Sequence, residues 1–169
     1  MALAVLLFTG CQAVQPKDTL DQRTLERTAS AFETTAQLKY RGIESTVTVK
    51  KELPVSYLVT FQSPDSLKGM EVQFAQDNVA IQYGKMKLDV SPDQLSSSAA
   101  VKLLASVIDS VVEQEDLQIE LEDGRAALTG RLDSGDFILI IDRETGNFLS
   151  LSMPDSEFEM TFENFTFFS

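Results

Sequence analysis

The feature that most constrains the fold is a period-two alternation of apolar and polar residues along much of the chain. Because successive side chains of a strand point to opposite faces of its sheet, this alternation predicts strands with one apolar face. Five such runs precede residue 91, each bounded by Pro, Gly, Asp or Asn: Val47/Val49, Tyr57/Val59/Phe61, Met70/Val72/Phe74, Val79/Ile81/Tyr83 and Leu88/Val90. We therefore expect an antiparallel meander.

The alternation resumes in the C-terminal part of the chain. The runs there are Leu117/Ile119/Leu121, Ala127 to Leu132, Phe137 to Ile141, Asn147 to Ser152 and Phe158/Met160/Phe162. Asp123-Gly124 is a hairpin signal between the first two runs. Phe165 and Phe167 are out of phase with the last run, so we expect a β-bulge near Asn164.

Two segments have the periodicity of helices. From Ser96 to Glu113, apolar residues occupy about half of the helical wheel, which favours a helix lying in the concave face of a curved sheet. Asp18 or Thr19 could cap a second helix that runs to about Gln37. Its apolar stripe would consist of Leu25, Ala29, Phe32 and Ala36. Together the elements predict an α+β fold built on a curved antiparallel sheet.

Charge and composition exclude several functions. The chain has 14 basic and 26 acidic side chains and a net charge of −12, which disfavours nucleic acid and disfavours lying flat on anionic lipid. It has no histidine, so Ser-His and Cys-His catalysis are excluded and zinc lacks its usual ligand. Acidic residues alternate along predicted strands, as in Glu120/Glu122, which indicates a solvated sheet face. We expect no catalytic site, metal or cofactor.

The N-terminus carries a second signal. Leu7-Phe8-Thr9-Gly10-Cys11 resembles the lipobox of bacterial lipoproteins, and Cys11 is the one cysteine in the chain. The resemblance implies that residues 1–10 are a signal segment, truncated and without Lys or Arg, and that Cys11 is acylated. Residues 11–17 would then be the lipidated cysteine and its tether. The expected location is extracytoplasmic, on the cell membrane or the outer membrane; the alternative is an ordinary N-terminus with a chance cysteine.

Local phrases of residues 18–169 resemble the LolA/LolB lipoprotein-carrier family, and within it most closely the GerS-like germination lipoproteins of spore-forming bacteria. The phrases are Phe32 to Tyr40, Tyr57 to Pro64, Val79 to Leu88, Ile141 to Asn147 and Met153 to Phe165. The resemblance implies a half-open barrel of about ten or eleven strands, closed by helices over an apolar cavity. It makes residues 18–169 one domain.

The resemblance implies two non-catalytic functions, and we keep both open. One is binding of an apolar or lipidated ligand in the cavity, as in lipoprotein carriers. The other is binding of a protein partner, such as a cell-wall amidase, as in the GerS-like set. The predicted cavity lining is Val59, Phe61, Val72, Phe74, Ile81, Tyr83, Leu104, Ile108, Phe137, Leu139, Phe158 and Met160. For each of these residues taken separately, ordinary core packing is the favoured interpretation.

Overall fold

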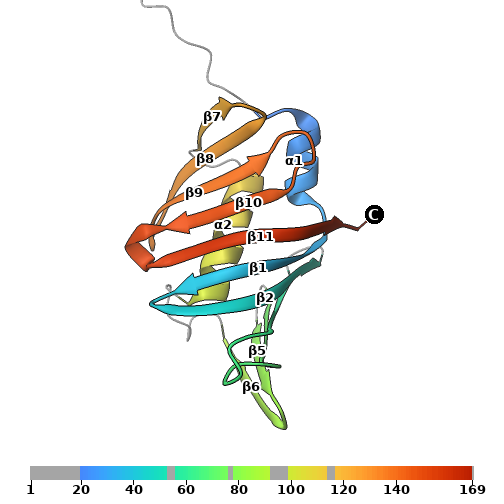
Figure 1. The fold of residues 1–169 in the computed structure, drawn as a ribbon, viewed down its shortest axis with the longest axis vertical. Helices are drawn as coiled ribbons and strands as arrows, with labels where there is room; N and C mark the ends of the chain where they lie inside the picture. Colours follow the sequence, from blue (N-terminus) through green and yellow to red (C-terminus); the bar gives the residue numbers. More distant parts are fainter. Residues whose placement is uncertain (1–19, 53–55, 76–77, 92–98, 114–116, 169) are drawn as a thin grey trace, which may run out of the picture.

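The computed structural model describes residues 20–52, 56–75, 78–91, 99–113 and 117–168. The predicted signal segment, Cys11 and the tether lie outside the described residues. Within them, the chain forms one strongly curved sheet with a long helix across one face (Figure 1). We call the face that carries this helix the inner face and the opposite one the outer face.

The sheet is an antiparallel meander of eleven strands that does not close. The strands run in the spatial order β6-β5-β4-β3-β2-β1-β11-β10-β9-β8-β7, so that β6 and β7 are its two edges. Their bounds are β1 Phe32–Tyr40, β2 Ile43–Glu52, β3 Ser56–Phe61, β4 Glu71–Ala75, β5 Asn78–Tyr83, β6 Met86–Val90, β7 Gln118–Glu122, β8 Arg125–Leu132, β9 Gly135–Asp142, β10 Phe148–Met153 and β11 Phe158–Phe167. A short 3-10 turn, η2 Pro154–Ser156, precedes β11. The predicted α+β half-open barrel is confirmed.

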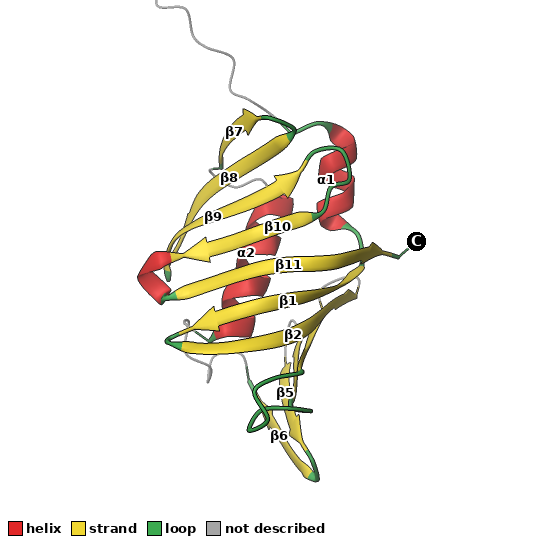
Figure 2. Cartoon of the chain, viewed as in Figure 1, coloured by secondary structure: helices red, strands yellow, loops and turns green. Residues whose placement is uncertain are grey.

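Helix α2, Ala100–Glu113, lies on the inner face as the wide apolar face of its sequence predicts (Figure 2). Its side chains Leu103, Leu104, Val107 and Ile108 are buried in the same cluster as the inner residues of the sheet. The prediction began this helix at Ser96, but residues 92–98 lie outside the described part of the chain. None of the described helices is long and apolar enough to cross a membrane.

The prediction for the first helix is wrong in extent. Helix α1 covers only Gln22–Ala29, and Asp21 caps it by accepting hydrogen bonds from the Thr24 backbone N–H and hydroxyl at 2.9 and 3.0 Å. These two bonds hold the pKa of the Asp21 carboxyl below its usual value. The stretch from Phe32 to Tyr40, expected to be partly helical, is strand β1.

The error has a physical cause. Phe32 and Ala36 are four residues apart, which fits one face of a helix and also one face of a strand. The residues between and beyond them decide: Phe32, Thr34, Ala36 and Leu38 are all buried and their neighbours are not. That period-two burial lets β1 pair with β2 on one side and β11 on the other.

The predicted bulge near Asn164 is confirmed. Pairing of β1 with β11 shifts register between Glu33 and Thr35, leaving one extra residue on β11, and Asn164 has a positive φ of 49°. The Thr34 hydroxyl donates to the Glu163 carbonyl at 2.6 Å within this irregularity. The bulge turns Phe165 inward, with its ring 4.8 Å from that of Phe32.

Candidate binding cavity

An apolar cavity of ≈ 240 Å³ lies between the inner face of β1–β5 and the first turn of α2. Ile43 on its wall is 54% exposed, so this part of the cavity is in contact with solvent. The wall is formed by Leu38, Tyr40, Ile43, Ser45, Phe61, Leu67, Val72, Ile81, Ala99, Ala100 and Val101. Tyr40 and Ser45 are the polar side chains among them.

The size of the side chains on α2 explains where the cavity lies. At the start of the helix, Ala99 and Ala100 extend little beyond the backbone, so the first turn leaves space above the sheet. Further along, Leu103, Leu104 and Ile108 are almost completely buried. Among the described residues, α2 therefore fills the inner face along most of its length and leaves a cavity beside its first turn.

The side chains that the structure describes on the cavity wall carry no formal charge. No carboxylate, lysine or arginine stands among its wall residues. The guanidinium of Arg41 lies over the ring of Tyr40, 5.2 Å from its centroid. Across the described residues there is no group of three or more His, Cys, Asp or Glu that could hold a metal ion.

The twelve residues predicted to line a cavity fall into three groups. Phe61, Val72 and Ile81 line the cavity that is present. Phe74 is partly buried against the core, and Tyr83 is exposed, with its hydroxyl donating to the Ser66 carbonyl at 3.3 Å. The others are buried in the cluster that fills the rest of the inner face: Val59, Leu104, Ile108, Phe137, Leu139, Phe158 and Met160.

Sequence reasoning missed most of the cavity wall. Leu38 and Tyr40 lie on β1, the strand mistaken in part for helix, and their period-two spacing was the signal that could have placed them. Leu67 comes from the β3–β4 loop, and Ala99 and Ala100 from the start of α2. No periodicity of the sequence distinguishes these small and loop residues from others of their kind.

A buried polar cluster fixes both helices to the sheet. The Tyr57 hydroxyl on β3 donates to the Asp109 carboxylate on α2 at 2.7 Å. Lys51 on β2 is buried, and its ammonium donates to the carbonyls of Thr28 and Ala29 at the end of α1, at 3.1 and 3.3 Å. Cations are favourable at a helix C-terminus, and these bonds satisfy carbonyls that the helix itself leaves unpaired.

The same cluster perturbs two ionisable groups. Burial lowers the pKa of Lys51, and the charge of Asp109 acts in the opposite direction. Burial raises the pKa of Tyr57, and the neighbouring Asp109 raises it further. The cluster lies at Asp109, well past the cavity along α2, so it holds the helix in place and stands apart from the cavity wall.

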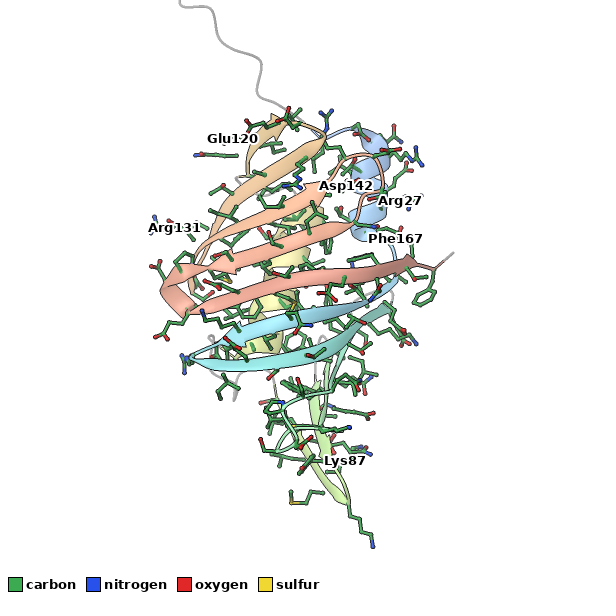
Figure 3. All side chains as sticks on the ribbon, in the orientation of Figure 1. Arg27, Lys87, Glu120, Arg131, Asp142 and Phe167 are labelled. Carbon is green, nitrogen blue, oxygen red and sulfur yellow. The ribbon has the colours of Figure 1, made fainter. Side chains whose placement is uncertain are left out.

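A second hollow, of ≈ 780 Å³, lies on the outer face of β7–β11. Its wall mixes charged residues with apolar ones: Glu120, Glu122, Asp123, Arg125, Ala127, Ile140, Leu149, Ser150, Thr161 and Phe162. Figure 3 shows Glu120 on β7 at the end of the molecule opposite to Lys87. The sequence predicted only a solvated face here.

No family model matches this sequence, and no curated protein matches it. Among solved structures, an uncharacterized conserved protein from Thermus thermophilus is similar with a TM-score of 0.57 at 16% identity, over 88% of this chain and 87% of that one. A LolA superfamily protein from Nitrosomonas europaea has a TM-score of 0.43 at 11% identity, over 90% of this chain and 95% of that one. A chain in the structure of the CwlD amidase from Clostridioides difficile in complex with the GerS lipoprotein has a TM-score of 0.47 at 12% identity. The match covers 82% of this chain and 88% of that one. At these identities the likeness concerns the fold alone.

Proposed function

We propose that this protein is a non-catalytic, extracytoplasmic lipoprotein that holds an apolar acyl ligand in the cavity at the start of α2. The observation that carries the proposal is the cavity itself: ≈ 240 Å³ of space with an almost wholly apolar wall, open to water. A ligand with an apolar chain would remove this wall from water, which is favourable. Phe61, Val72 and Ile81 are the predicted ligand-binding residues that belong to this site.

The cavity proposal is tested with an environment-sensitive fatty-acid probe, 11-(dansylamino)undecanoic acid, added to the full chain. We expect saturable enhancement of its fluorescence and displacement by a diacylated lipopeptide. Val101→Asp puts a carboxylate on the wall and should abolish binding. Ile138→Ser, on the outer face of β9, is the control and should leave binding unchanged. Absence of saturable binding would overturn the proposal.

The second part of the proposal is that Cys11 carries the membrane anchor. It rests on the lipobox-like sequence before Cys11 and on the absence of a second cysteine. With a complete signal region placed ahead of the chain, Cys11→Ser should abolish labelling by an acyl precursor and reduce recovery in the membrane fraction. Stable retention requires more than one acyl chain. Unchanged labelling would contradict the anchor.

The alternative function is binding of a protein partner, such as a cell-wall amidase, on the sheet. The outer hollow favours it, because apolar Ile140 and Leu149 lie there beside Glu120 and Glu122. Purified cell-wall amidase titrated against the protein would then bind, and Ile140→Asp would weaken that complex. The same variant should leave the fatty-acid probe unaffected, which separates the two functions.

A further inference from the structure

The β5–β6 hairpin carries an exposed apolar surface that is continuous with the cavity. Ile81 lines the cavity and pairs across the hairpin with Leu88, and Tyr83 pairs with Met86. Paired and alternate residues share one sheet face, so all four side chains lie on the inner face. Leu88 is 56% exposed, Met86 69% and Tyr83 39%. Figure 2 shows that this hairpin projects beyond the rest of the sheet.

Exposure on this scale is unusual among the described residues. Besides these three, the large apolar side chains that are exposed are Ile43, Ile138 and Phe168, and Ile43 belongs to the cavity wall. Of the six, Ile43 lines the cavity, and the three hairpin side chains lie on the same sheet face as Ile81, which also lines it. Contiguous exposed apolar surface next to a pocket is typical of a binding site.

At the end of the sheet beside the cavity, each of three successive connections carries a cation, although the chain is acidic overall. In an antiparallel meander the β1–β2, β3–β4 and β5–β6 connections lie at the same end of the strands. They carry Arg41, Lys68 and Lys85, respectively. The Tyr83 hydroxyl donates a hydrogen bond to the Ser66 carbonyl, so the β3–β4 loop, which also holds Lys68, lies against the hairpin. Acidic residues are also present there: Glu44, Asp65 and Asp89, the last 3.7 Å from the ammonium of Lys87.

Under the C-terminal strands, the connections at the same end of the sheet are acidic. The β8–β9 and β10–β11 connections lie at the same end of the strands. They carry Asp133, Asp155 and Glu157. Across the whole chain acidic residues exceed basic ones by 12. Three successive connections with a cation each, beside the apolar opening, are therefore a local exception to the charge of the molecule.

We propose that the ligand is a long single acyl chain with an anionic head group. Its tail occupies the cavity, its upper methylenes lie along Ile81, Leu88, Tyr83 and Met86, and its carboxylate or phosphate lies beside Lys85 and Lys68. The inference rests on the cavity function proposed above and adds the length of the chain and the charge of the head. Continuity of the exposed apolar surface with the cavity is the ground for the long chain, and the cation on each of the three connections is the ground for the anionic head.

Chain length tests the apolar surface. Decanoate and hexadecanoate are each titrated against the full chain by displacement of the dansyl fatty-acid probe. Met86→Ser combined with Leu88→Ser should weaken hexadecanoate about tenfold and leave decanoate within about twofold, because only the longer chain reaches the hairpin. Ile138→Ser, which replaces a side chain 42% exposed on the outer face, is the matched control and should change neither.

Variation of the head-group charge tests the role of the cations on these connections. Lys68→Glu combined with Lys85→Glu should weaken both hexadecanoate and hexadecyl phosphate about tenfold and leave hexadecanol unchanged. The ratio of the two anions in the unaltered protein distinguishes a carboxylate from a phosphate. Melting temperatures of all variants should stay close to that of the parent, since the altered side chains are exposed.

The outcomes separate this inference from the function on which it rests. If decanoate binds but hexadecanoate gains nothing from Met86 and Leu88, or if head-group charge is without effect, the extended site is overturned and the cavity function stands. If neither acid displaces the probe and the probe itself does not bind, both fall. Equal losses for the two chain lengths would also overturn the inference.

Discussion

The inner face of the sheet has two regions that differ in how they are filled. Over β8–β11, side chains such as Leu128, Phe137, Leu139 and Ile141 are fully buried beneath α2. Over β4–β6, Ile81 is only partly buried, and Leu88 and Met86 are exposed. We call the first the filled region and the second, together with the cavity, the open region. Both are built from strands with the same apolar alternation.

The difference arises from the helix and from position in the sheet. Leu104 and Ile108 are buried, branched side chains of α2, whereas the small side chains of Ala99 and Ala100 border the cavity. The β5–β6 hairpin also lies at an edge of the sheet, where it has neighbours on one side only. An alternating strand therefore predicts which face is apolar, and the element opposite decides whether that face becomes core or cavity.

A buried charge should distinguish the two regions most strongly. Ile108 is fully buried, so Ile108→Asp should lower the free energy of unfolding by about 3–5 kcal/mol or prevent folding. Val101 is 7% exposed and lines the cavity, so Val101→Asp can turn its carboxylate toward the cavity and should cost less, about 2 kcal/mol. Urea unfolding measures both. Equal losses would mean that α2 is covered to the same degree at its two ends.

Truncation of one leucine in each region gives a smaller contrast. Leu139→Ala leaves a void in the filled region and should cost about 3 kcal/mol. Leu67→Ala only enlarges an existing opening, so we expect about 1 kcal/mol or less. The fatty-acid probe should bind Leu139→Ala unchanged where that variant is folded. A large loss for Leu67→Ala would show that the β3–β4 loop carries more of the stability than its partial burial implies.

The link between the helix and the sheet should have a moderate effect that depends on pH. Tyr57→Phe removes the hydrogen bond to Asp109 and should cost about 1–2 kcal/mol at pH 7. Because the pKa of Tyr57 is raised in the folded protein, its contribution is fully present below the unfolded value of about 10 and declines as the pH rises above it.

The corresponding measurement is urea unfolding of the parent and of Tyr57→Phe at pH 7 and at pH 10.5. The difference between the two proteins should shrink at the higher pH. Fatty-acid binding at pH 7 should be retained, because Tyr57 is not on the cavity wall. A difference that grows with pH would contradict the raised pKa.

Much of the sheet could be predicted from the sequence, because alternation and turn residues act locally. The boundary at Phe32 could not, since its spacing to Ala36 fits either period and pairing with β2 and β11 decides it. The cavity could not be placed either, because it depends on how α2 lies over strands distant in the chain. The cluster of Lys51, Tyr57 and Asp109 likewise forms only when three elements meet.

The bulge at Asn164 gives the smallest expected effect and tests the seam between β1 and β11. Asn164 has a φ of 49°, a conformation that asparagine and glycine adopt more easily than residues with an ordinary Cβ. Asn164→Ala should therefore cost about 1 kcal/mol in urea unfolding, and Asn164→Gly should be nearly neutral. Equal losses for both would instead assign the effect to the asparagine side chain. The bulge turns Phe165 onto Phe32 and Phe148, and the ring of Phe148 lies 5.4 Å from that of Phe165. Asn164→Ala should therefore lower the free energy of unfolding without changing fatty-acid binding in the cavity.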